Sequence, residues 1–251
     1  MIEVLPIKGI GEIEPGADLA AEVAAALHSG GPVPLPGDIL VVTQKIVSKA
    51  EGRFVDLDTV TPGAEAKRLA AIVAKDPRLV ELVLAESSEI VRAVRGVLIA
   101  RHRCGWVMAN AGIDRSNRGP DRGDQVLLLP VDADASAARL REGLAAAGLD
   151  VAVLISDSFG RPWRYGVVNV ALGAAGLPSL VDRRGEFDRD GRRLEVTQIA
   201  VGDMVATAAG LVMGEGNEGV PVALVRGVSF GRATERPASA LNRALGEDLF
   251  R

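Results

Sequence analysis

Three separate stretches of the sequence place oxygen-bearing side chains beside glycines, where the chain can bend sharply. Asp157 and Ser158 follow an apolar run, Asp114 and Asn117 share one short polar segment, and Glu215 lies in a glycine-rich segment. Carboxylate and hydroxyl oxygens are ligands that Mg²⁺ and Mn²⁺ prefer. Each stretch alone also fits an ordinary surface turn. Together the three predict a divalent-metal site, provided that the fold brings them to one place.

Basic residues near these stretches indicate that the cation would carry a phosphate. Lys45 and Lys49 follow a strongly β-branched run, and Arg161 and Arg164 follow the first acidic stretch. Glycines in the third stretch would let backbone amides approach an anion closely. A solvated surface strand fits residues 44–53 equally well. No GxxxxGK[ST] phosphate loop occurs in the sequence, so a nucleotide site would have to be built from separate segments.

Length and composition limit the classes of protein that fit this sequence. The chain has 251 residues, of which 48% are hydrophobic and 25% are charged, as in globular proteins with one large core or two modest domains. Its net charge of -4 argues against a nucleic-acid partner. The one cysteine, Cys104, excludes an internal disulfide. Charged residues interrupt the start of the chain, so we expect a cytoplasmic protein with no membrane partner.

Apolar periodicity predicts the elements that would position these side chains. Buried strands are expected at residues 1–7, 38–43, 96–100, 125–131, 151–155 and 220–225, with another near Ile90. Helices are expected from Asp18 onward and at residues 64–74, 77–85, 134–149 and 194–211, with a short one around 238–245. Gly160 and Pro162 would end the strand at 151–155, which puts Asp157 and Ser158 on a bend.

The order of these elements favours an α+β fold. The succession of strand, helix and strand over residues 125–158 predicts a parallel pair joined by a right-handed crossover. Residues 182–193 are mostly charged and should form a solvated hairpin or loop. No internal repeat or long linker is visible, so a second part would arise by insertion. His102 lies near the second acidic stretch and could touch a substrate, although a histidine beside a tryptophan is more often a packing residue.

Four segments, taken together, resemble the coenzyme F420-0:L-glutamate ligases, also called F420 γ-glutamyl ligases. These segments are residues 45–53, 110–117, 156–160 and 214–221, and the likeness extends to residues 86–92 and 247–251. The resemblance implies a single domain over residues 1–251 that can include an inserted subdomain. It also implies an α+β fold with mixed sheets and helices, in which a two-part monomer forms an intertwined homodimer.

The activity that the resemblance implies is that of a GTP-dependent, GDP-forming acid–amino-acid ligase. Such an enzyme activates the terminal carboxylate of the deazaflavin coenzyme F420-0 as an acyl phosphate. It then adds L-glutamate, followed by γ-linked glutamates, with one or two Mg²⁺ or Mn²⁺ ions and stimulation by K⁺. Another metal- and nucleotide-dependent carboxylate–amine ligase with a different acceptor fits the same residues. A non-catalytic nucleotide-binding protein rarely needs metal ligands from so many segments.

Roles can be carried over from the family position by position. Metal ligation is implied for Asp114, Asp157, Ser158 and Glu215, and catalysis for Lys49 and Asp157. The implied GTP contacts are Ile10, Gly11, Glu12, Ile13, Gln44, Lys45, Lys49, Asn117, Met213, Gly214, Glu215, Gly216, Asn217, Glu218, Gly219 and Val220.

The sequence also departs from the family pattern at several of these positions. Gln44 and Lys45 stand where the family often has hydroxyl residues, and Gly11 and Glu12 stand where it often has Pro-Leu. Ser158 replaces a common threonine and keeps the hydroxyl group. Asn217 stands where aspartate is frequent.

Overall fold

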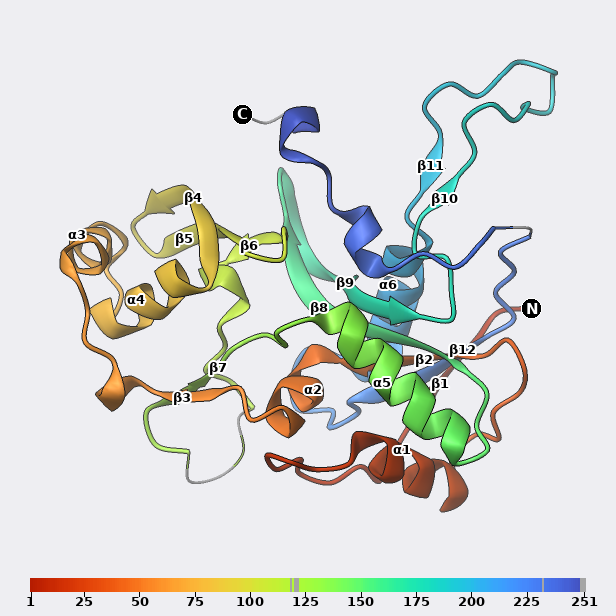
Figure 1. Cartoon of the computed structure of the whole chain (residues 1–251), viewed down its shortest axis with the longest axis horizontal. Helices are drawn as coiled ribbons and strands as arrows, with labels where there is room; N and C mark the ends of the chain where they lie inside the picture. Colours follow the sequence, from red (N-terminus) through yellow and green to blue (C-terminus); the bar gives the residue numbers. More distant parts are fainter. Residues whose placement is uncertain (118, 120–121, 232, 249–251) are drawn as a thin grey trace.

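The computed structural model describes residues 1–117, 119, 122–231 and 233–248 (Figure 1). The elements in chain order are β1 (Glu3–Ile7), α1 (Leu19–His28), β2 (Ile39–Thr43), α2 (Gln44–Ala50), β3 (Phe54–Asp56), η1 (Leu57–Thr59), α3 (Ala64–Val73), α4 (Pro77–Ala85), β4 (Ser87–Val94), β5 (Val97–His102), β6 (Val107–Ala109), η2 (Asn110–Gly112), β7 (Gln125–Leu127), α5 (Ala133–Ala146), β8 (Ala152–Arg161), β9 (Arg164–Ala175), β10 (Val181–Asp182), β11 (Gln198–Ile199), α6 (Val201–Met213), β12 (Val222–Arg226), η3 (Ala238–Leu241) and η4 (Leu245–Glu247). Interleaved helices and sheets of mixed direction confirm the predicted α+β class.

The largest sheet has the strand order β1-β12-β2-β8-β9. Its β2 and β8 strands run parallel, whereas its other neighbouring strands run antiparallel. Residues 39–42 of β2 are fully buried. This continuous apolar run is typical of a strand that is covered on both faces.

Helices cover both faces of this sheet, because successive apolar side chains of its strands point to opposite faces. Leu40 and Val42 of β2 belong to a hydrophobic cluster with residues of α1, α2 and α5. Ile39 and Val41 belong to a second cluster with residues of α6. In Figure 1, α5 and α1 lie in front of the sheet and α6 lies behind it. Each such side chain stabilises the fold by about 1.5–3 kcal/mol on burial.

We call the described part of residues 54–128 the small lobe. Its own hydrophobic cluster includes Leu57, Leu69, Val80 and Leu98. Helices α3 and α4 pack beside the β4-β5-β6 sheet, and β3 pairs with β7 where the small lobe meets the rest of the molecule (Figure 1). Both helices lie close to their predicted bounds.

The strand that carries Asp157 is longer than predicted. β8 continues through Gly160 to Arg161, and it pairs with β9 in a long hairpin in which Ser158 lies opposite Asn169. Gly160 therefore lies inside the strand, and the prediction that Asp157 and Ser158 lie on a bend was wrong. The apolar run alone did not reveal β9, whose pairing lets β8 continue past the core.

The predicted parallel unit over residues 125–158 was also wrong. β7 pairs antiparallel with β3, whereas the parallel neighbour of β8 is β2. α5 does precede β8, as predicted, but the chain reaches it from the small lobe. Apolar periodicity identifies a strand and does not identify its partner when that partner lies far away in the sequence.

Two further segments differ from the predictions. Residues 44–50 form helix α2 rather than a solvated surface strand. Helix α6 begins only at Val201, because residues 198–199 form strand β11, which pairs with β10. The charged segment between β10 and β11 projects from the body as an exposed arm, in agreement with the predicted solvated loop (Figure 1).

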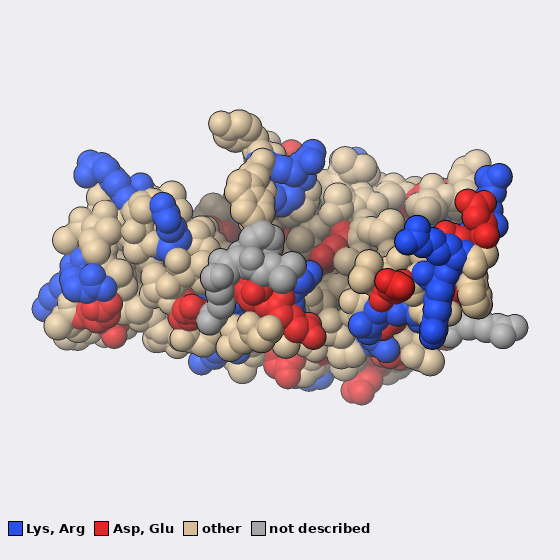
Figure 2. Space-filling view, turned by 90° about the horizontal axis from the view of Figure 1, so that it is seen from above, with Lys and Arg blue, Asp and Glu red and all other residues tan. Residues whose placement is uncertain are grey.

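Figure 2 shows basic and acidic side chains next to one another on the face that it presents. In the part of the chain that the structure describes, no helix is long and apolar enough to cross a membrane.

Candidate active site

A cavity of about 940 Å³ lies at one edge of the main sheet. The strand register explains its position. Val222 pairs with both Ile7 and Val42, and the next residue of β2, Thr43, pairs with Ser156. The end of β1, the start of β12, the junction of β2 with α2 and the outer half of β8 therefore meet at the same edge.

This edge collects all but one of the predicted site residues. Those that line the cavity are Ile10, Gly11, Glu12, Ile13, Lys45, Lys49, Asp114, Asn117, Asp157, Ser158, Met213, Gly214, Glu215, Gly216, Asn217, Glu218, Gly219 and Val220. The exception is Gln44, which is 3% exposed and lies behind the cavity wall. Its side chain accepts a hydrogen bond from Ser48 and donates one to Asp157, so it supports an acid of the cavity.

Helix α2 brings two lysines to the cavity. Lys45 and Lys49 are four residues apart, and this spacing places them on the same face of a helix. The Lys45 ammonium group contacts the carboxylate of Asp114 and lies 3.2 Å from the backbone oxygen of Ser116. The Lys49 side chain is only 6% exposed and forms an ion pair with Glu12. The helix thus holds two cations opposite acids from other segments.

Asp157 and Asp114 lie close enough to influence each other's charge. Burial raises the pKa of Asp157 to about 7, and the neighbouring Asp114 charge adds to this effect. Burial also opposes the ionisation of Asp114, but hydrogen bonds from Lys45 and the Ser116 backbone outweigh it and hold its pKa below the ordinary value. The cavity therefore contains one acid, Asp114, that is paired with a lysine, and another, Asp157, whose ionisation is disfavoured by burial.

The loop after α6 closes another side of the cavity. Gly214 has φ +73°, and a Cβ atom there would lie 2.2 Å from the carboxyl carbon of Glu218. The Glu218 carboxylate accepts a hydrogen bond of 2.8 Å from the backbone N–H of Gly216. Asn117 donates to the Gly216 carbonyl at 3.3 Å, which joins this loop to the small lobe. The backbone of the loop can therefore hold an anionic group.

Several cavity residues were not predicted from the sequence. Asn169 of β9 lies opposite Ser158, and nothing in its sequence context indicates that β9 reaches the site. Arg115 and Ser116 also line the cavity, and their position next to Asp114 is a signal that could have included them. Ser156 precedes Asp157 in β8, and its buried hydroxyl group has no hydrogen-bond partner among the described residues.

Other candidate residues do not reach the cavity. Arg161 and Arg164 are not among the residues that line it, and Arg161 donates to the Tyr165 carbonyl at 2.9 Å. His102 is 1% exposed, stacks on Trp106 and accepts a hydrogen bond from the Cys104 N–H. His102 is therefore a packing residue, which was the more frequent of the two roles considered for it.

The oxygen groups of the cavity fit a divalent cation that is shared with a phosphate. Within the described ranges, no three histidine, cysteine or acidic side chains are grouped closely enough to hold a metal ion by themselves. Mg²⁺ in nucleotide sites typically has one or two carboxylate ligands, with phosphate oxygens and water completing its shell. The partly buried Asp157, whose pKa is raised mainly by burial, and the adjacent Asp114 match this pattern.

Comparison with known proteins identifies the family. The model of the F420-0:Gamma-glutamyl ligase family matches residues 9–227. The coenzyme F420:L-glutamate ligase of Methanothermobacter thermautotrophicus is 44% identical over 100% of this chain and 99% of its own length. Those of Methanopyrus kandleri and Halobacterium salinarum are 43% and 46% identical, over 100% and 98% of this chain and 97% and 94% of their own lengths. The chain belongs to the F420-0:gamma-glutamyl ligase family.

Proposed function

We propose that this protein is a GTP-dependent ligase that adds L-glutamate to the terminal carboxylate of coenzyme F420-0, and then adds γ-linked glutamates in coenzyme F420 biosynthesis. One observation supports this proposal most strongly. Six separate segments converge on one cavity that contains Lys45, Lys49, Asp114 and Asp157, in a chain that belongs to the F420-0:gamma-glutamyl ligase family. An activating nucleotide and a carboxylate acceptor both require cationic groups of this kind.

GTP would bind with its phosphates between helix α2 and the loop of residues 213–220. Lys49 would supply a fixed positive charge, and the glycines of the loop would let backbone N–H groups approach the phosphates. Residues 10–13 form another part of the same wall. Asn117, which already reaches across to Gly216, would close the nucleotide in from the small lobe.

A divalent cation, Mg²⁺ or Mn²⁺, would be held by Asp114, Asp157, Ser158 and Glu215, and it would neutralise charge on the transferring phosphoryl group. Asp157 and Ser158 are adjacent in β8, and Asp114 comes from the small lobe. Lys45 would share Asp114 with the cation. A second divalent ion and stimulation by K⁺ belong to the same proposal and are tested by titrating each cation separately.

The chemistry would proceed in two balanced steps. A carboxylate oxygen of the acceptor attacks the γ-phosphorus of GTP, and the bond from this phosphorus to the β-phosphate oxygen breaks. The products are GDP and the acyl phosphate of the acceptor. The neutral amine of glutamate then attacks the acyl carbon, an amide bond forms and phosphate departs with the amine proton. Lys49 stabilises charge on the phosphates, and the cavity walls exclude water that would hydrolyse the acyl phosphate.

Mass spectrometry of the acceptor tests this proposal directly. After incubation with GTP, Mn²⁺ and glutamate, the acceptor should gain whole glutamyl units with equimolar formation of GDP. Asp157→Ala should fold and lose at least about 100-fold in both GTP turnover and glutamylation, because removing a metal ligand costs more than removing a residue that supports one. Nucleotide hydrolysis without glutamylation would instead favour a ligase with another acceptor.

We propose that the active form is an intertwined homodimer, as the family resemblance implies. Light scattering of the purified chain at several concentrations measures its mass directly. A monomer mass at concentrations where ligation is at full rate would refute this part of the proposal and leave the reaction unaffected.

A further inference from the structure

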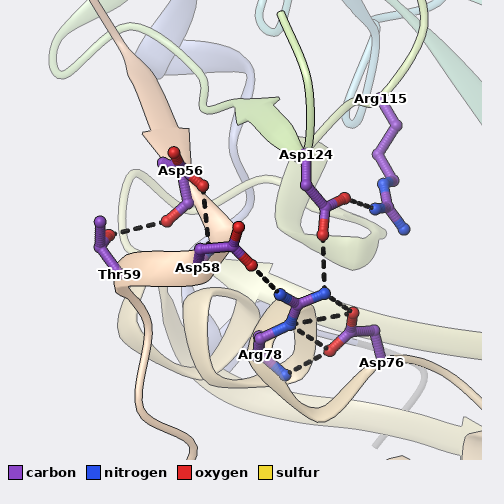
Figure 3. A network of polar contacts seen from close by, with 7 residues as sticks. All are labelled: Asp56, Asp58, Thr59, Asp76, Arg78, Arg115 and Asp124. Atoms are coloured by element: carbon purple, nitrogen blue, oxygen red, sulfur yellow. Dashed lines mark hydrogen bonds and ion pairs between the residues drawn. The ribbon is translucent and has the colours of Figure 1, made fainter.

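Arg78 lies at the centre of an ionic network that joins helix α4 to Asp124 and, through it, to Arg115 (Figure 3). Arg78 is the second residue of α4. Its guanidinium group donates several hydrogen bonds to the carboxylate of Asp76, the helix N-cap. The third guanidinium nitrogen, Nη1, lies 2.7 Å from Asp58 in η1. Nη2, one of the two nitrogens that contact Asp76, also lies 2.7 Å from Asp124, just before β7. One side chain therefore joins three segments of the small lobe.

The branch through Asp124 leads to the cavity. One carboxylate oxygen of Asp124 accepts from Arg78, and the other forms an ion pair with Arg115, which lines the cavity (Figure 3). Arg115 follows Asp114 directly, and the Asp114 backbone exchanges two hydrogen bonds with Leu127 of β7. Arg78 is thus linked through Asp124 to Arg115, the residue next to a candidate metal ligand, although Arg78 itself does not line the cavity.

The branch through Asp58 ends outside the cavity. The Asp58 side chain is 78% exposed, and neither it nor its neighbours in η1 line the cavity. The two branches share one guanidinium group and have the same contact distance, but only one of them reaches Arg115. This difference allows an effect on the site to be separated from an effect on the small lobe as a whole.

We propose that Arg78 is a positioning residue for the ligation reaction, which acts through Asp124 to hold Arg115 at the cavity wall. The inference rests on the proposed function, because Arg115 would meet the phosphate groups of the bound nucleotide. A free arginine side chain has many rotamers, and the ion pair with Asp124 selects one of them before the nucleotide arrives. Arg78 keeps Asp124 in the orientation in which Asp124 pairs with Arg115.

The experiment compares two matched substitutions in the full chain. Asp124→Asn weakens the branch to Arg115, and Asp58→Asn weakens the branch that ends in solvent. We expect Asp124→Asn to raise the KM for GTP about three- to tenfold with a smaller change in kcat, because an arginine that must be ordered on binding costs affinity. Asp58→Asn should leave both constants within about twofold of wild type. Equal effects of the two substitutions would overturn the inference.

The Arg115→Ala background gives a second, independent readout. If Asp124 acts through Arg115, adding Asp124→Asn to Arg115→Ala should not raise the KM for GTP further. Arg78→Lys retains the charge without the planar fork, and it should resemble Asp124→Asn. A purely structural role of the network would make the effects of Asp124→Asn and Arg115→Ala additive, which would overturn the inference.

Hydrogen–deuterium exchange without nucleotide separates this inference from the proposed function. Asp124→Asn should increase exchange in residues 113–117, and Asp58→Asn should not. If exchange changes as expected while the wild type neither binds GTP nor ligates glutamate, the proposed function fails and the positioning of Arg115 stands. If the wild type is active and exchange in residues 113–117 is the same in both variants, the positioning role fails alone.

Discussion

The ammonium group of Lys49 is paired with the carboxylate of Glu12, which comes from the loop after β1. Lys49 is almost completely buried, whereas the Glu12 side chain is 41% exposed. A phosphate that binds to Lys49 must therefore share this cation with a carboxylate that belongs to the protein itself.

Replacing Glu12 should change nucleotide affinity and stability in opposite directions. Glu12→Gln leaves Lys49 without its charged partner, so the ligand-free protein should lose about 1 kcal/mol, or about 2–4 °C in Tm. The same change should lower the Kd for GDP with Mn²⁺ about three- to tenfold, because the phosphate no longer competes with a carboxylate. Calorimetric titration and thermal unfolding measure the two effects. A weaker affinity for GDP would contradict the competition.

Asp157 should make the metal-free protein less stable as the pH rises. A carboxyl group whose pKa is raised by folding binds more protons in the folded state, so stability declines between its unfolded pKa, near 4, and its folded pKa of about 7. Asp157→Asn removes this titration and should unfold at a higher urea concentration than wild type at pH 8, with a smaller difference at pH 5. Unfolding curves with a chelator test this expectation, and parallel pH profiles would contradict it.

Glu86 should have the opposite dependence on pH. It is buried and contacts Arg53, Arg103 and His102, and these partners outweigh the effect of burial and lower the pKa of Glu86. A carboxyl group of this kind stabilises the fold above its unfolded pKa, and the contribution is lost as the pH falls through the folded value. Glu86→Gln should therefore cost about 2–3 kcal/mol at pH 7 and much less at pH 3, as urea titrations at the two pH values would show.

Gly210 of α6 should control the position of Asn169 at the cavity wall. A Cβ atom at Gly210 would lie 1.9 Å from the side-chain oxygen of Asn169. Alanine has a higher helix propensity than glycine by about 1 kcal/mol, so Gly210→Ala should still fold. It should also displace Asn169 and raise the KM for at least one substrate of the ligation reaction severalfold. In the double variant with Asn169→Ala, the free energy of unfolding should rise to the value expected from helix propensity. If it does not rise, the added methyl group must clash with another residue.

Local patterns in the sequence were enough to predict every α-helix of the described residues except α2, and most of the strands. Asp18 was expected to begin α1, and its carboxylate does cap the N–H groups of Ala20 and Ala21. The residues that line the cavity were predicted mostly through family resemblance, because segments as far apart as residues 10–13 and 213–220 carry no local signal that they meet.

Pairing between distant segments explains the errors. The partner of β8 is β2, more than 100 residues earlier, and no local pattern could indicate this register. The helical nature of α2 was open to detection, since Gln44 and Ser48 form a hydrogen-bonded pair at helical spacing and Ile46, Val47 and Ala50 form its apolar face. The alternating polar residues of the same segment also fit a strand. The segment is a helix in the structure, and its polar residues Gln44 and Lys49 are buried.

The position of β12 has a consequence for biosynthesis of the protein. β12 is the last strand of the main sheet in the sequence, yet it lies between β1 and β2, which are the first two. During translation, β1 and β2 have no direct contact within the sheet and must wait for residues 222–226 to leave the ribosome. The sheet therefore closes only after residues 222–226 are available, and until then the facing edges of β1 and β2 have no partner strand.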